Sequence, residues 1–161
     1  MSTGTLSVTA KGDREIVMTR EFNAPRTLVF DAHTKPELIR RWMLGPPGWS
    51  MVVCEVDLRV GGAYRYSWRK EGGPEMGMGG IFREVKAPER LVSNEKFDDA
   101  WYEGECLGTI VLTENAGRTT LIQTLLYDTP AARDSVIKSP MEQGIAYSYD
   151  RLDDLLASSS R

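Results

Sequence analysis

Apolar and polar side chains alternate through the middle of the chain. In the stretch VGGAYRYSWRK, Val60 to Lys70, every second position is aromatic (Tyr64, Tyr66 and Trp68). Period two is typical of a β-strand, because successive side chains point to opposite faces. The pattern therefore predicts a strand with one dry face. It leaves open whether that face meets protein core or forms the wall of a pocket.

Further runs of this kind are separated by turns rich in glycine, proline and aspartate, which predicts an antiparallel meander. The expected strands are residues 50–58, 62–70, 76–86, 90–97, 104–114 and 118–127, with an earlier strand at 15–22. A meander of this type must hide one face, so another element has to cover it.

Two short helices are expected between the first strand and the meander. Pro25 lies where a helix can begin, because proline suits the first helical turn. Thr34 and Glu37 match the capping box, in which each side chain satisfies a free backbone N–H of the other residue. The second helix should therefore begin there and end near Trp42.

After the meander, the segment DTPAARDSVIK predicts one or two helical turns. Ser139 and Glu142 form a second capping box, which predicts the start of a long terminal helix. Helical spacing continues along its apolar side, at Met141, Ile145, Tyr149, Leu152 and Leu156. The order of elements predicts a two-layer α+β domain.

The length and composition indicate one ordinary globular domain. The chain has 161 residues, of which 41% are hydrophobic and 27% charged. We expect a domain at 13–157 with flexible tails at 1–12 and 158–161. No apolar run approaches the ~18 residues that would indicate a membrane span. The first twelve residues lack the pattern of a secretory signal, so we expect a cytoplasmic protein.

Charge and cysteine content exclude several functions. The net charge of −3 disfavours a nucleic acid as partner. Cys54 and Cys106 are expected to be free buried thiols, and with the single histidine, His33, they cannot supply a clustered metal site. Neither a phosphate-binding loop nor a dinucleotide fingerprint occurs, so no cofactor is expected. No nucleophile motif occurs either, so no catalytic residue is assigned.

The alternation also predicts which residues face the covering helix. The inward set comprises Val52, Cys54 and Val56 on one strand, Gly104, Cys106, Gly108 and Ile110 on another, and Gly144 and Ser148 on the terminal helix. These side chains are small in both layers. Either the helix packs closely on the sheet, or a cavity separates them.

Several motifs occur together in a characteristic order. They are Arg20, Ala24, Pro25, FDAHTKPELIRRW, the Glu55 to Gly62 pattern E-x-D-x-R-x-GG, the turn KAPERL, and MEQGIAYSYDRLDDLLA near the end. In this order, from about Asp13 to Ala157, the chain resembles the homologues of the activator of the heat-shock chaperone ATPase. That family belongs to the START and birch-pollen-allergen (SRPBCC) superfamily.

The resemblance implies a helix-grip fold, in which a curved antiparallel sheet wraps around a long C-terminal helix and encloses an apolar cavity. Related proteins hold lipids, sterols, polyketides or hormones there. Positions carried over as scaffold are Pro25, Trp42, Asp57, Gly61, Gly62 and Gly144. Position 33, often tryptophan or phenylalanine in the family, is histidine here.

We therefore expect a protein that binds or sequesters a small apolar molecule, aromatic or lipid-like. The expected ligand-binding residues are Trp49, Cys54, Tyr64, Tyr66, Trp68, Met76, Met78, Phe82, Cys106, Gly108, Met141 and Ile145. Aromatic side chains supply contact area and methionine adapts to irregular shapes.

Two other functions stay open. A polyketide cyclase or aromatase would need a tuned acid or base inside the pocket, for which tyrosine hydroxyls or an inward Glu84 are the candidates. A chaperone co-factor ranks last, because the sequence shows no second domain or charged linker. No chaperone partner is expected, and a homodimer stays open.

Overall fold

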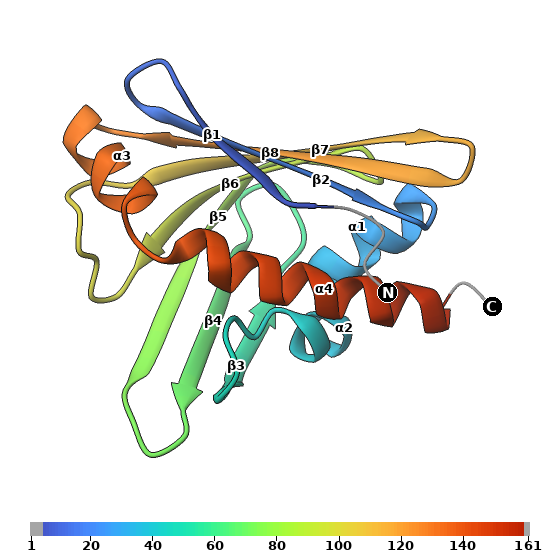
Figure 1. Ribbon diagram of the computed structural model, residues 1–161, viewed down its shortest axis with the longest axis horizontal. Coiled ribbons are helices and arrows are strands. Elements are labelled where there is room, and N and C mark those ends of the chain that lie inside the picture. The colour runs from blue at the N-terminus through green and yellow to red at the C-terminus, as the bar shows by residue number, and fades with distance from the viewer. Residues whose placement is uncertain (1–4, 160–161) are drawn as a thin grey trace.

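A computed structural model describes residues 5–159 of the chain. Its sheet has eight antiparallel strands in the order β1-β2-β8-β7-β6-β5-β4-β3. The strands are β1 (Ser7–Lys11), β2 (Glu15–Phe22), β3 (Trp49–Val56), β4 (Ala63–Lys70), β5 (Glu75–Lys86), β6 (Arg90–Phe97), β7 (Cys106–Asn115) and β8 (Arg118–Tyr127). The sheet curves around one long helix (Figure 1).

The helices are α1 (Arg26–Thr34), α2 (Pro36–Trp42), α3 (Pro130–Ile137) and α4 (Met141–Ser159). α4 runs along the concave side of the sheet, and α1 and α2 lie beside it (Figure 1). This is the expected α+β helix-grip architecture. The six strands of the meander and the strand at 15–22 are confirmed to within two residues at each end.

The expected tails are partly structured. Ser7–Lys11 form β1, which pairs with β2 in a register that places Val8 opposite Met18. This strand is mostly exposed and shows no hydrophobic alternation, so the sequence pattern did not predict it. It forms because its backbone pairs with the edge of β2. At the other end, α4 continues to Ser159. Residues 1–4 and 160–161 of these tails lie outside the described residues.

Neither capping box forms as expected. The Thr34 hydroxyl donates to the Phe30 carbonyl at 2.9 Å, and Lys35, the N-cap of α2, has no side-chain cap. The Ser139 hydroxyl donates to the Val136 carbonyl at 2.5 Å. In each case the hydroxyl belongs to the end of the preceding helix, because the two helices follow with almost no connection.

A β-bulge reverses one predicted face. The pairing of β3 with β4 shifts between Met51 and Val53, so an extra residue stands opposite its partner strand. Val52 is consequently 37% exposed rather than inward, while Cys54 stays buried.

The main hydrophobic core lies under the C-terminal half of α4. Leu152, Leu155 and Leu156 are buried there against Phe22 and Leu121 of the sheet, together with Val29, Ile39, Trp42, Leu112 and Tyr149. The N-terminal half of α4 is less buried, and Ser148 is its first buried residue. The helix is therefore packed tightly at one end.

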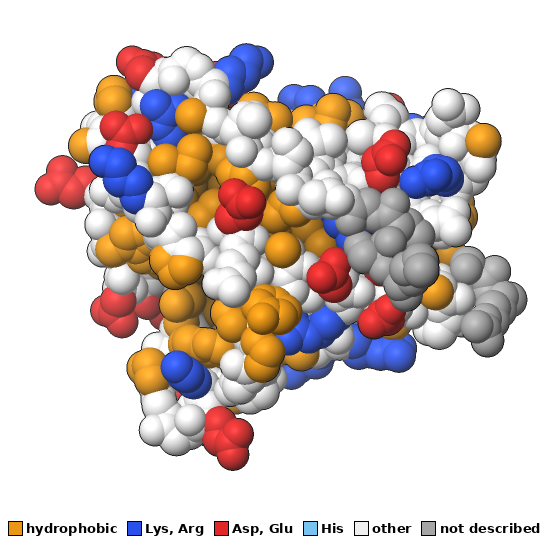
Figure 2. All heavy atoms as spheres, in the orientation of Figure 1, with side chains coloured by type: hydrophobic (Ala, Val, Ile, Leu, Met, Phe, Trp, Pro, Cys, Tyr) orange, Lys and Arg blue, Asp and Glu red, His pale blue; other side chains and the backbone are white. Residues whose placement is uncertain are grey.

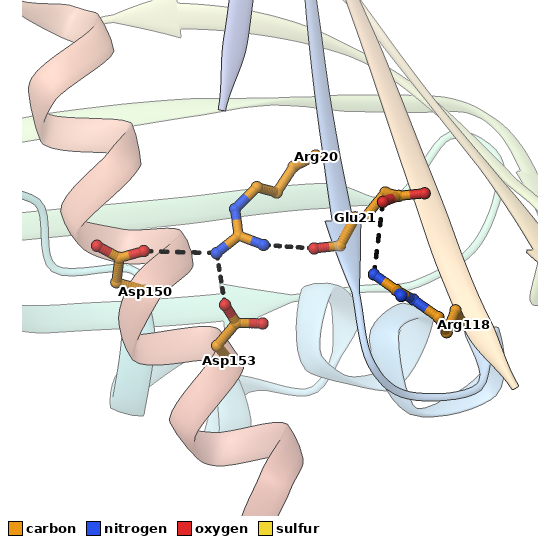
Figure 3. Close-up of polar contacts among 5 residues, drawn as sticks. All are labelled: Arg20, Glu21, Arg118, Asp150 and Asp153. Carbon is orange, nitrogen blue, oxygen red and sulfur yellow. Dashed lines mark hydrogen bonds and ion pairs between the residues drawn. The ribbon is translucent and has the colours of Figure 1, made fainter. Parts of the chain in front are cut away.

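A buried ion pair joins this half of α4 to the sheet (Figure 3). Arg20 alternates with Met18 and Phe22 on the inner face of β2, and its side chain is 1% exposed. Its guanidinium contacts Asp153 at 2.5 Å and Asp150 at 3.4 Å, and donates to the Glu21 carbonyl. A buried arginine is tolerated only when such partners satisfy it.

We expect Arg20→Ala to lower the free energy of unfolding by about 3–5 kcal/mol, because it removes the buried cation that contacts Asp153 at 2.5 Å. Denaturant titration measures the loss. The control is Arg118→Ala, since Arg118 makes an exposed ion pair with Glu21 at 3.5 Å and should contribute at most about 0.5 kcal/mol. Equal losses in the two variants would show that the buried pair does not hold α4.

Candidate ligand-binding cavity

A cavity of about 770 Å³ lies between the concave face of the sheet and the N-terminal half of α4. Strands β4 to β8 and the loops at one end of the sheet line it. Aromatic side chains dominate its wall: Trp42, Trp49, Tyr64, Tyr66, Trp68, Phe82, Phe97, Trp101, Tyr102, Tyr127 and Tyr149. Three methionines of the expected set, Met76, Met78 and Met141, also line it, as does Ile145.

Alternation along β4 sorts its side chains between this cavity and solvent. Tyr64, Tyr66 and Trp68 all line the cavity. Arg65 and Arg69 point to the opposite face, where they pair with Asp98 and Glu75. The aromatic stripe therefore lines the cavity, while Tyr64 and Tyr66 also belong to the main hydrophobic core.

The small residues of two layers face each other across the cavity. Cys106 and Gly108 of β7 line one side, and Gly144 and Ser148 of α4 line the other. Ile110 of β7 joins them.

Four residues of the expected inward set do not line the cavity: Val52, which the β3 bulge exposes, Val56, which packs against the main core, and Gly104 and Cys54. Gly104 precedes β7, in a loop with φ of 84°, where Asp128 occupies the space a side chain would need. Cys54 is buried in the main core, near Glu37 and Arg40 of α2, and does not line the cavity.

The mouth of the cavity lies at the start of α4. Met76 and Trp101 line the cavity yet remain 41% and 46% exposed, so they stand at its edge. In the space-filling view, hydrophobic side chains gather on this face around the first turns of α4 and towards the β4–β5 hairpin (Figure 2). Charged side chains lie mostly around this apolar area.

The loop 43–48 beside the mouth is held by hydrogen bonds. The Gly45 N–H donates to the Ser148 hydroxyl at 2.9 Å, and Arg151 donates to the Gly45 carbonyl at 2.7 Å. The Trp68 indole donates to the Met43 carbonyl at 2.7 Å. The loop is therefore tied both to α4 and to β4, which fixes the wall to which Met43, Leu44, Gly45 and Pro46 contribute.

Glu95 of β6 is the carboxyl group inside the cavity, and the sequence interpretation missed it. Its Oε2 atom is enclosed and has no hydrogen-bond partner among the described residues. Burial raises the pKa of Glu95 to about 7, because desolvation disfavours the charged form. The alternation of side chains along β6 could have predicted its place. Every second residue of this strand lines the cavity: Leu91, Ser93, Glu95 and Phe97.

Gly108 makes room for this carboxyl group. A Cβ atom at position 108 would lie 2.4 Å from Glu95 Oε2. Any larger residue there would push the carboxyl group aside. The missing side chain of Gly108 thus determines where Glu95 lies.

Five tyrosines surround Glu95 closely enough to interact with its charge: Tyr64, Tyr66, Tyr102, Tyr127 and Tyr149. Burial raises the pKa of each above its usual range, and the Glu95 carboxylate raises it further. Burial, followed by Glu95, also raises the pKa of Cys106. These hydroxyl and thiol groups are therefore neutral at physiological pH.

His33 places a second polar atom at the cavity wall. Its Nδ1 lies 2.8 Å from the Val29 carbonyl, so Nδ1 carries the proton and donates. Nε2 then has a free lone pair, and it has no partner among the described residues. Burial lowers the pKa of His33 to about 4, so the ring is neutral. Its centroid lies 4.9 Å from that of the Trp42 ring.

Glu84, the expected inward acid, faces outward. The pairing of β5 with β6 shifts between Phe82 and Glu84, and this bulge reverses the face of the residues beyond it. Glu84 forms ion pairs with Arg90 at 3.0 Å and Lys86 at 3.3 Å. It therefore takes no part in the cavity.

Comparison with known families identifies the chain. Residues 23–157 match the family described as activator of Hsp90 ATPase homolog 1-like protein. The chain belongs to this family. No curated protein matches the chain.

Solved structures of other proteins show the same fold. A protein from Rhodobacter sphaeroides is 30% identical, with 95% of this chain and 98% of that chain covered and a TM-score of 0.89. One from Nitrosomonas europaea is 25% identical, with 93% and 98% covered and a TM-score of 0.81. An Hsp90-activator-like protein from Aeromonas hydrophila, 20% identical, has the same fold with a TM-score of 0.67 over 90% and 95% of the two chains.

Other kinds of site find no support in the residues that the structure describes. They contain no group of histidine, cysteine, aspartate or glutamate residues that could hold a metal ion. No helix between residues 5 and 159 is long and apolar enough to cross a membrane.

Glu95 should make stability depend on pH. Its pKa of about 7 in the folded state exceeds the ordinary value of 4.5, so the folded state binds the proton more tightly. Its contribution is fully present below pH 4.5 and is lost as pH rises through 7. We expect the unfolding free energy of the parent to fall relative to Glu95→Gln across this window, by on the order of 1–3 kcal/mol.

Denaturant titrations of both proteins between pH 4.5 and 7.5 test this. His33 contributes with the opposite sign in the same window, since its pKa is lowered, and subtracting the two titrations cancels it. Glu84→Gln is the control, because ion pairs lower the pKa of Glu84 and reverse the sign. Parallel curves for the parent and Glu95→Gln would contradict the burial of this carboxyl group.

Proposed function

We propose that the protein binds a small, mostly apolar molecule, with an aromatic or lipid-like body, in this cavity. The observation that carries the proposal is the cavity itself: about 770 Å³, lined by aromatic and methionine side chains and open at one end. Volumes of about 300–1,000 Å³ and apolar walls with few polar groups are typical of small-molecule sites.

The free-energy cost of an unfilled cavity supports a functional reason for this one. Protein interiors are close-packed, and side chains around an empty space lose their dispersion contacts on that side. Gly144 and Ser148 of α4 occupy positions where larger apolar residues could fill part of the gap. A Cβ atom at Gly144 would meet Pro46 only at an ordinary contact distance of 3.5 Å, so packing does not require glycine there.

A cyclase-type enzyme is the second candidate, and Glu95 is the observation that favours it. A general base works best when its pKa is close to the working pH, and the pKa of Glu95 is raised to about 7 inside the cavity. The surrounding neutral tyrosine hydroxyls could donate hydrogen bonds to a polyketide-like substrate. Turnover of such a substrate that is lost in Glu95→Gln would favour this candidate over binding alone.

Binding of N-phenyl-1-naphthylamine, a neutral apolar fluorophore, tests the proposal. We expect about one equivalent to bind the parent with enhanced fluorescence, and a rise in melting temperature that grows with dye concentration. Cys106→Leu should weaken binding by about tenfold or more, because it adds volume on the cavity side of β7.

The matched control is Thr109→Leu, which adds a leucine to the opposite face of the same strand. It should bind the dye as the parent does. A parent that binds no dye, or equal binding by all three proteins, would show that the cavity is not the binding site.

A further inference from the structure

The cavity contains two polar atoms whose hydrogen bonds are unmade. Glu95 Oε2 and His33 Nε2 are the buried side-chain atoms without a partner among the described residues, and both residues line the cavity. A buried polar atom left unpaired costs about 1–3 kcal/mol. Two such atoms in one wall indicate that something outside the folded chain satisfies them.

Both atoms accept hydrogen bonds. The carboxylate of Glu95 offers only lone pairs when ionised, and His33 uses its proton on the Val29 carbonyl, which leaves Nε2 as an acceptor. Above pH 7, where Glu95 is ionised, the missing partner must therefore donate. This requirement disfavours ligands whose polar groups are carbonyls or carboxylates.

The charge of the lining points the same way. Among the described residues that line the cavity, Glu95 is the only carboxyl group, and neither lysine nor arginine contributes. Arg20 belongs to the packed half of the concave side, where it is engaged with Asp153 and Asp150. Any cation that balances Glu95 has to arrive with the ligand.

Aromatic rings surround the same carboxyl group. Tyr64 and Tyr66 pack against each other with ring centres 5.0 Å apart, and Tyr102 and Tyr127 do so at 5.4 Å. The charge of Glu95 raises the pKa of all four tyrosines, so it lies close to each of them. The faces of aromatic rings attract organic cations, and more strongly in a desolvated site.

We propose that the ligand is a lipophilic amine, whose ammonium N–H donates to Glu95 while its apolar body lies against the aromatic and methionine wall. This inference rests on the proposed function and names its ligand class. The ammonium group adds the attraction between two opposite charges to the hydrogen bond, which an alcohol that donates to the same carboxylate lacks. A carboxylic acid of equal size would place a second negative charge beside Glu95.

Gly108 is the positioning residue for this contact. Its lack of a side chain lets Oε2 lie where a Cβ atom would come within 2.4 Å. Alanine at this position should move the carboxyl group while leaving Glu95 and the apolar wall in place.

Displacement of bound N-phenyl-1-naphthylamine at pH 8 by decylamine, 1-decanol and decanoate tests the proposal, because the three compounds share one alkyl chain. We expect decylamine to bind the parent about tenfold or more tighter than 1-decanol, and decanoate to bind weakest. In Glu95→Gln the ratio of decylamine affinity to 1-decanol affinity should shrink to about threefold or less. Glu84→Gln, on the outer face, should keep the parent preference.

Gly108→Ala provides a variant that keeps the carboxyl group. In this variant the ratio of decylamine affinity to 1-decanol affinity should fall to about the square root of the parent ratio or lower, whatever the change in dye affinity. Equal affinities of decylamine and 1-decanol for the parent, or a preference unaffected by Glu95→Gln, would overturn the amine proposal and leave cavity binding intact. Failure of the dye itself to bind would instead overturn the proposed function.

Discussion

The buried ion pair between Arg20 and Asp153 is the contact on which the arrangement of sheet and helix depends. The Arg20 guanidinium lies 2.5 Å from the Asp153 carboxylate and so joins β2 to α4. This contact lies in the region where Leu152, Leu155 and Leu156 complete the core. Because an arginine on an inner face needs a partner at a fixed place, the pair determines the position of the helix as well as stabilising it. The preceding turns of α4 then extend from this anchor over the cavity, and the first buried residue of the helix is Ser148.

The two halves of α4 therefore have different tasks. The packed half supplies hydrophobic burial, which leaves the other half free to present Gly144, Ile145 and Ser148 to an open space. The loop 43–48 closes one side of that space. Hydrogen bonds join it to Ser148 and Arg151 of α4 and to the indole of Trp68 on β4. With the wall fixed in this way, the unpaired acceptors Glu95 Oε2 and His33 Nε2 remain as the polar features a ligand would meet.

Alternation and turn residues are local signals, so they predicted a two-layer α+β domain, nearly all strand ends and the side of β4 that faces inward. The helix-grip fold itself was implied by the resemblance to a known family. The local signals failed where a long-range contact or a single extra residue decides the outcome. β1 forms through edge pairing with β2, which its polar sequence does not show. The bulges after Met51 and Phe82 reversed the faces of Val52 and Glu84. Glu95 was within reach of the alternation of β6, but a charged residue inside a cavity runs against the usual rule that carboxylates face water.

The central claim is that the N-terminal half of α4 and the concave face of β4 to β8 enclose a site open to apolar molecules. Titration of the isotope-labelled protein with N-phenyl-1-naphthylamine, followed by amide NMR spectra, tests it most directly. The account predicts the largest shifts at Tyr66, Cys106 and Ile145, and small ones at Leu152 and Leu156 in the packed half. Shifts concentrated instead at the exposed hydrophobic residues of the outer surface, Ile81 and Ile122, or no shifts at saturating dye, would contradict it.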